Sequence, residues 1–207
     1  HTDKVFIEII KTDGNIIMQI GSCNKELLER VKGMFNQIPN TSFIPIQQDI
    51  LIKLLPLYGK NISNIKDFYP ITKEAHFFDN LLTYLNSLNE EEHAGIQFIL
   101  RGVNKNEEMQ ARRRDLERKA IKGKRRQTDR ETYIYQLYQQ KQESNLFKVK
   151  INVFANKKPI LPILKSIIQA LNFEENTFFS YGTSSKRILS RFISPDTVFS
   201  NVHEIRK

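Results

Sequence analysis

Two stretches of alternating apolar and polar residues enclose the most polar part of the chain, and each predicts a β-strand. In residues 94–103 an apolar side chain recurs at every second position, which places one face of the strand against a core. Residues 146–154 repeat this alternation, with lysine and asparagine on the opposite face. The apolar positions are Ile96, Phe98, Leu100, Phe147, Val149, Ile151 and Val153. Strands with one apolar face are typical of an antiparallel sheet that is covered on one side.

The remaining periodic segments predict further short strands and amphipathic helices. Asp13-Gly14 between two apolar runs is a strong signal for a β-hairpin turn. Asn24 is a suitable N-cap for the helix that comes next, and Pro45 places its strand at a sheet edge or a bulge. The predicted strands are 5–10, 15–20, 42–47 and 177–181, and the predicted helices are 24–38, 73–88 and 159–173.

Two segments have no clear period. In residues 49–71, Ile50, Ile52 and Leu54 alternate as in a strand, but proline and glycine interrupt the rest of the segment, so we expect loops and short strands. The tail from Ser184 onward is basic and irregular.

The order of these elements predicts an α+β fold, with an antiparallel sheet and helices on one face. Residues 15–103 have the order β-α-β-β-α-β, which is the ferredoxin-like order. Residues 146–181 add a further β-α-β. We therefore expect an α+β unit at 1–103, a protruding basic helical hairpin at 104–145, and a segment at 146–207 that completes the sheet, all within one compact domain.

The excess positive charge of the chain is concentrated in the predicted hairpin. Between Lys105 and Arg126 there are ten basic and four acidic residues, an excess of six in a chain whose formal net charge is +9. Gly123 is a natural helix end, and Thr128 with Glu131 forms a capping box for a second helix. The basicity is therefore one local feature of an otherwise nearly neutral protein.

Composition excludes several classes of protein. The 207 residues are 40% hydrophobic and 27% charged, as in an ordinary soluble domain. Cys23 is the only cysteine, so the chain forms no internal disulfide and no cysteine-based zinc site. No apolar run approaches the length of a membrane span. We expect a cytoplasmic chain without a cofactor or metal, not inserted in a membrane and excised from a longer protein.

The basic segment is the main candidate for a binding site, because several cations along one surface are what a nucleic-acid backbone requires. The candidate contacts are Arg112, Arg113, Arg114, Arg118, Lys119, Lys122, Lys124, Arg125 and Arg126, with Tyr135 and Tyr138 as candidates for stacking on unpaired bases. Three alternatives stay open: DNA, an acidic partner subunit, or a solvated hairpin without a partner. Such tyrosines are more often the semi-buried face of a helix that packs on its own domain.

No catalytic motif accompanies this segment. Residues 182–186 lack the first glycine and the spacing of a phosphate-binding G-x-x-x-x-G-K-[ST] loop. The four histidines share no metal-binding spacing, and no serine has the setting of a nucleophile. Glu90, Glu91 and Glu92 are explained as the solvated end of a helix. We therefore expect a protein that is not an enzyme within these residues.

The central segment resembles a known family. A helix that ends in L-N-S-L-N-E-E-E, then H-A-G-I-Q-F-I-L-R, a basic excursion and F-K-V-K-I-N-V-F-A is similar to the region ahead of the motor domain in bacterial type IV secretion ATPases, of the coupling-protein-like kind that serves conjugative DNA transfer. The resemblance covers roughly residues 5–173. Gly102 stands where members often have proline, and the chain has no tryptophan.

The resemblance implies a non-catalytic domain for assembly or substrate docking, with the 104–143 arm as the contact element. DNA, other secretion-system subunits and further copies of the chain are the implied partners, and the inner face of the cell membrane is the implied place of the full-length protein. The alternatives are a stand-alone nucleic-acid-binding protein and a pure oligomerisation domain.

Overall fold

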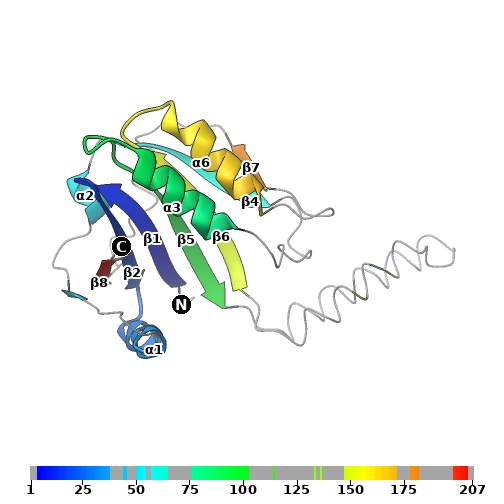
Figure 1. Ribbon diagram of the computed structural model, residues 1–207. Helices are drawn as coiled ribbons and strands as arrows, with labels where there is room; N and C mark the ends of the chain where they lie inside the picture. The colour runs from blue at the N-terminus through cyan, green and yellow to red at the C-terminus, as the bar shows by residue number, and fades with distance from the viewer. Residues whose placement is uncertain are drawn as a thin grey trace, which may run out of the picture.

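The computed structural model describes residues 4–37, 44–45, 50–54, 57–64, 76–102, 147–171, 178–181 and 198–204, with the single positions 114, 133 and 136. These residues form an α+β structure around an antiparallel sheet (Figure 1). The strands are β1 (Lys4–Thr12), β2 (Asn15–Ser22), β3 (Ile44–Pro45), β4 (Tyr58–Asn64), β5 (Ala94–Gly102), β6 (Phe147–Ala155), β7 (Phe178–Tyr181) and β8 (Val198–Glu204). The helices are α1 (Lys25–Phe35), α2 (Ile50–Lys53), α3 (Phe77–Ser87) and α6 (Ile160–Gln169).

The predicted hairpin is confirmed. Strands β1 and β2 pair from Val5 opposite Ser22 to Thr12 opposite Asn15. Asp13 and Gly14 form the turn with φ angles of 47° and 77°. Positive φ at both central positions is the geometry whose twist matches paired strands, and it explains why Asp-Gly stands there.

The sheet has eight strands in the spatial order β3-β8-β2-β1-β5-β6-β4-β7, which differs from the sheet of the ferredoxin-like fold that the order along the chain predicts. In a ferredoxin-like sheet β2 would lie between β4 and β5. Instead β2 pairs with β1 and β8, while β5 pairs with β1 and β6. The physical reason is the hairpin turn, which commits one edge of β2 to β1 and leaves only the other edge for a distant strand.

Helices α3 and α6 cover one face of the sheet and form the main core with it. Successive rows of apolar side chains cross the central strands, such as Ile9 beside Ile96 beside Val153. Phe77 of α3 meets Phe98 of β5 edge to face, with ring centroids 5.8 Å apart. The buried residues that the two helices contribute are Phe77, Leu81 and Leu85 from α3, and Ile160, Leu161, Leu164 and Ile168 from α6. Burial of this many large side chains is the main source of stability.

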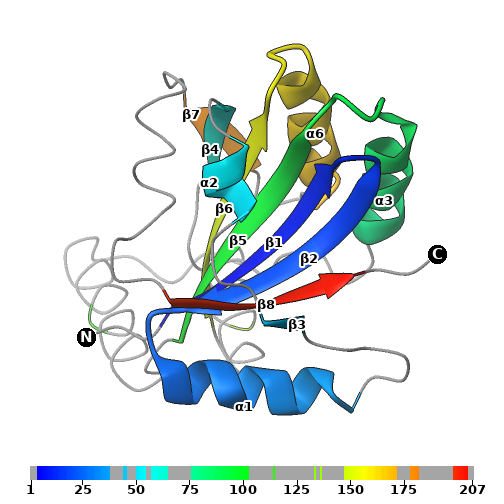
Figure 2. The ribbon, with the colours of Figure 1, turned by 90° about the vertical axis from the view of Figure 1, so that its left-hand side faces the viewer.

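The opposite face carries α2, so the prediction of helices on one face holds only for α3 and α6. Figure 2 shows α2 on the side of the sheet away from those two helices. Leu51 of α2 is buried with Ile10, Leu57 and Phe154 in a second, smaller cluster. The strand-like alternation of residues 50–54 is therefore a helical turn, in which Leu51 points to the sheet.

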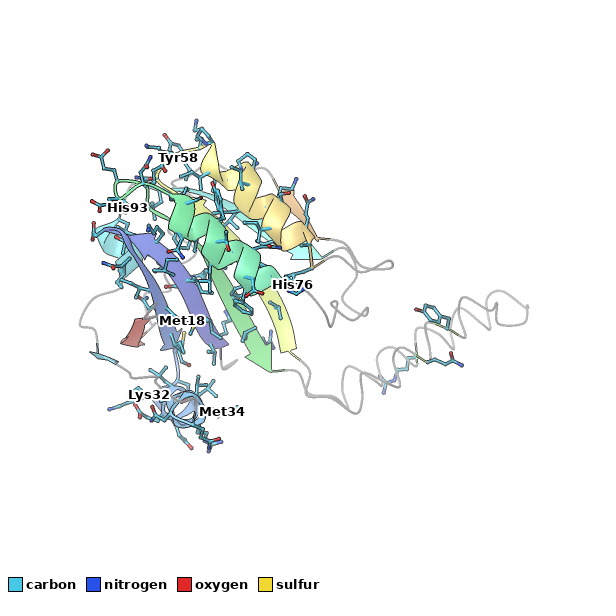
Figure 3. The ribbon with its side chains drawn as sticks, in the orientation of Figure 1. Met18, Lys32, Met34, Tyr58, His76 and His93 are labelled. Carbon is cyan, nitrogen blue, oxygen red and sulfur yellow. The ribbon has the colours of Figure 1, made fainter. Side chains whose placement is uncertain are left out.

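The other elements confirm some predictions and correct others. The side-chain oxygen of Asn24 accepts a hydrogen bond from Leu27 N at 3.2 Å and so caps α1 as predicted. Strand β3, which contains Pro45, stands at the sheet edge as predicted. The prediction of an irregular tail is wrong for residues 198–204, because β8 pairs with β2 there. Helix α1 buries Leu28 but leaves Met34 70% exposed (Figure 3).

One glycine position is dictated by packing across the sheet. Gly95 of β5 lies opposite Phe154 of β6, whose ring is fully buried. A Cβ atom at position 95 would lie 2.6 Å from Phe154 Cζ and would collide with the carbonyl oxygen of Ile9. The absence of a side chain therefore lets the aromatic ring lie across β5, where it joins the cluster under α2.

We predict that Gly95→Ala destabilises the protein by about 1–3 kcal/mol, because the backbone of β1 and the ring of Phe154 must both move. Thermal unfolding followed by circular dichroism measures the effect. Gly33→Ala is the matched control: it lies on α1 with nothing within 4 Å of its added Cβ. That change should stabilise the helix by about 0.5–1 kcal/mol. Equal melting temperatures for the two variants would contradict the packing account.

Candidate nucleic-acid interface

The predicted contact residues fall mostly outside the described part of the chain. Arg114 is described, and it is helical and exposed. Tyr133 and Gln136, on the second predicted helix, are also helical and exposed. The predicted contacts outside the described residues are Arg112, Arg113, Arg118, Lys119, Lys122, Lys124, Arg125, Arg126, Tyr135 and Tyr138.

The 104–143 arm connects two strands, β5 and β6, that pair with each other. We call the end of these strands from which the arm begins the root of the arm. β5 ends at Gly102 and β6 begins at Phe147, and these two residues face each other in the register. Gly102 and Phe147 therefore lie side by side at the same end of two neighbouring strands, β5 and β6 (Figure 1). An insertion anchored in this way has a fixed point of departure on the sheet.

Further cations stand at the same end of the sheet. Lys4 of β1 is paired with Arg101 of β5, and Arg101 is paired in turn with Lys148 of β6. Lys150 is two residues further along β6, opposite Ile99. Because side chains alternate along a strand, Lys4, Arg101 and Lys150 share one face of the sheet. All three are exposed. We call Lys4, Arg101 and Lys150 the strand-end strip.

The arrangement of the strip is electrostatically unfavourable in isolation. Like charges directly opposite one another on neighbouring strands destabilise a sheet. Neither Lys4 nor Arg101 has a carboxylate at ion-pair distance in the part of the chain that the structure describes. Alternation along the sequence places Arg101 and Lys150 on the polar faces of their strands, but only the pairing register brings Arg101 beside Lys4 and places Lys150 on the next strand. For this reason the strip was not predicted.

Nearer the middle of the sheet, the same face carries a row of buried polar side chains. The Glu8 carboxylate accepts hydrogen bonds from Gln19 Nε2 at 3.0 Å and from Gln97 Nε2 at 2.5 Å. Asn152 Nδ2 donates to Gln97 Oε1 at 2.6 Å. All four side chains are at most 1% exposed. The backbone N–H of Ile50, at the start of α2, donates to Gln19 Oε1 at 3.3 Å, so the row also holds α2 in place.

We predict that Gln97→Ala costs about 1–3 kcal/mol for each buried group that it leaves without a partner. The Glu8 carboxylate loses one donor and the Asn152 amide loses its acceptor. Urea unfolding gives the change in free energy. Gln37→Ala, at an exposed position after α1, should leave the free energy of unfolding nearly unchanged. A Gln97 variant as stable as the Gln37 variant would show that the row adds nothing.

The opposite end of the sheet is closed by a clamp between two loops. Asn156 Oδ1 accepts from His93 N at 3.0 Å, and Asn156 N donates to His93 O at 2.8 Å. Lys157 Nζ lies 3.1 Å from Glu92 Oε1. A hydrogen bond from the backbone N–H of Asn89, and then Lys157, lower the pKa of Glu92. Burial, and then Glu92, raise the pKa of Tyr84.

The glutamates at 90–92 therefore have different roles. Glu90 and Glu91 are exposed as predicted, whereas Glu92 closes the clamp. His93 lies at this end and His76 at the far end of α3, so these two histidines are well separated (Figure 3). Among the described residues no group of histidine, cysteine, aspartate and glutamate is arranged to hold a metal ion.

We predict a pH signature for Glu92. Its pKa is lower in the folded than in the unfolded chain, so its contribution to stability is present above the ordinary value of 4.5 and is lost as the pH falls through the folded pKa. Glu92→Gln should therefore melt below the unaltered protein at pH 7, and the difference should shrink below pH 4.5. Glu91→Gln is the control. A pH-independent difference for Glu92→Gln would contradict the clamp.

No helix within the described residues is long and apolar enough to cross a membrane.

Comparisons with known proteins add no relative. No family model matches the chain, and neither the curated proteins nor the solved structures gave a significant match. The assignment of function therefore depends on the geometry and charge of the chain itself.

Proposed function

We propose that this chain is a non-catalytic domain for assembly or substrate docking in a type IV secretion or conjugation machine, and that it contacts DNA through the basic 104–143 arm. One observation carries the proposal: two thirds of the formal net charge is concentrated in a single insertion between two paired strands. Folding alone does not require an excess of six positive charges in one loop, whereas binding a phosphate backbone does.

The resemblance of residues 5–173 to the region ahead of the motor in type IV secretion ATPases supplies the biological setting of this proposal. In that setting the domain works on the cytoplasmic side, at the inner face of the cell membrane through the full-length protein. The arm then presents DNA, or a partner subunit, to a motor that lies outside these residues. Of the two partners, DNA is favoured, because the strand-end strip adds further cations at the root of the arm.

Binding to fluorescent DNA across a salt series tests the proposal. With six or more phosphate contacts, affinity should fall by about a thousandfold or more between 50 and 200 mM salt. The variant with Arg112, Arg113, Arg114, Lys124, Arg125 and Arg126 changed to Gln should lose most of this binding. Fluorescence anisotropy on mixed-sequence single- and double-stranded oligonucleotides measures both quantities.

The outcomes separate the proposal from its alternatives. Absence of binding at low salt would contradict a DNA contact and favour a partner subunit. Binding that the arm variant retains would place the contact elsewhere on the chain. A change of molecular mass on removing the arm, measured by light scattering, without any DNA binding, would favour a pure oligomerisation domain.

A further inference from the structure

We infer that the strand-end strip is a second phosphate-binding surface, on which DNA held by the arm continues across the sheet. This inference rests on the proposed function and adds a contact site to it. The strip consists of Lys4, Arg101 and Lys150, and Lys148 is paired with Arg101 in the register. The three described side chains are exposed on one face, at the end of the sheet from which the arm departs.

The arrangement of Lys4 beside Arg101 is electrostatically unfavourable. Lys4 and Arg101 are direct neighbours across β1 and β5, where like charges repel, and no carboxylate in the described residues relieves either of them. The clamp at the opposite end of the same strands shows the contrasting solution, because there Lys157 is paired with Glu92. An anion from outside the chain would provide at the strip what Glu92 provides at the clamp.

The spacing of the cations fits an anion that carries its charges along a chain. Neighbouring strands are about 4.8 Å apart, so Lys4 and Arg101 are about 5 Å apart across β1 and β5, and the line of cations continues diagonally to Lys150, two residues further along β6. A DNA strand carries one charge every 3.4 Å or so along its axis, and flexible lysine and arginine side chains can follow such a line of charge. The line begins at the root of the arm, so one nucleic-acid chain can contact both.

The strip has no exposed aromatic side chain beside it on β1 that could stack on DNA bases. The next aromatic residue on this face along β1 is Phe6, which is only 4% exposed and is therefore not available for stacking on bases. Contacts from Lys4, Arg101 and Lys150 would then be charge contacts to phosphates without stacking on bases. Such contacts orient DNA without selecting its sequence.

The test is the variant Lys4→Gln/Arg101→Gln/Lys150→Gln in the intact chain, with mixed-sequence single- and double-stranded DNA across a salt series. Three lost phosphate contacts should make the slope of log affinity against log salt shallower by about 2–3 on duplex DNA, and by slightly less on single strands. Lys25→Gln/Arg30→Gln/Lys158→Gln removes the same charge from α1 and from the loop before α6, and should leave the slope unchanged.

A stability measurement shows that the variant is folded and tests the same strip by a second route. Because the changes at Lys4 and Arg101 remove like-charge repulsion, the melting temperature of a variant that carries Lys4→Gln and Arg101→Gln alone should equal or exceed that of the unaltered protein at low salt. Added salt should raise the melting temperature of the unaltered protein more than that of the variant, since screening relieves a repulsion that the variant no longer has.

The failures of the two proposals can be told apart. If the unaltered protein binds DNA and the strip variant keeps its affinity and slope, the strip is not a contact, although the arm can be one. If the arm variant keeps salt-sensitive binding that only the strip variant loses, the strip alone is the site. If the unaltered protein binds no DNA at low salt, both proposals are overturned. A preference for one oligonucleotide sequence that depends on the strip would contradict the phosphate-only contact.

Discussion

The register of the central strands depends on one buried row of polar side chains, formed by Glu8, Gln19, Gln97 and Asn152. Apolar alternation excludes a slip of one residue, because such a slip would turn every core side chain to the wrong face. It does not exclude a slip of two residues, which keeps the faces. A two-residue slip of β5 would place Gly95 or Ile99 beside Glu8, so the buried carboxylate would lose the hydrogen bond from Gln97 and keep the one from Gln19. The polar row therefore selects one register among those that the hydrophobic pattern permits.

This selection has a cost in stability. A carboxylate and three amides lose their contact with water, and hydrogen bonds recover only part of that free energy. The Oδ1 atom of Asn152 is buried without a hydrogen-bond partner, which shows that the compensation is incomplete. A purely apolar row of similar volume would pack against the sheet at lower cost, as at the face under α3 and α6. What the polar row adds is a unique alignment of the strands.

The strand-end strip takes its geometry from that alignment. Lys4 is four residues before Glu8, and Arg101 is four residues after Gln97. Both intervals are even, so each cation shares a face with the polar residue of its own strand. The hydrogen bond between Glu8 and Gln97 thus fixes the neighbour of Lys4, about 13 Å away along the strands. A change in register would separate the cations before it disturbed the arm, because the arm begins at the end of β5 wherever that strand lies.

Local chemistry was readable from the sequence, whereas long-range pairing was not. Asp13-Gly14 and Asn24 act within three residues of their own positions, and both were predicted correctly. The partner of β5 is β1, some 90 residues earlier in the chain, and no local pattern specifies it. Strand β8 was missed for the same reason, since its place depends on the free edge of β2. The excess charge of the arm was visible in the composition, but the strip exists only once the strands are paired.

The two ends of β5 and β6 differ in how their charged and polar groups are paired, and the 104–143 arm begins at one of them. At one end Asn156 joins the loop before β5 to the loop after β6 through backbone and side-chain hydrogen bonds. At the other end the pairing of Gly102 with Phe147 gives the arm its origin, and no described ion pair neutralises Lys4 or Arg101. Between them lie the buried row and the ring of Phe154 across Gly95, which pack this part of the sheet closely. In the proposed function, a contact made by the 104–143 arm would lie beside this packed part of the sheet, and the charges of Lys4 and Arg101 lie where a bound anion would complete their pairing.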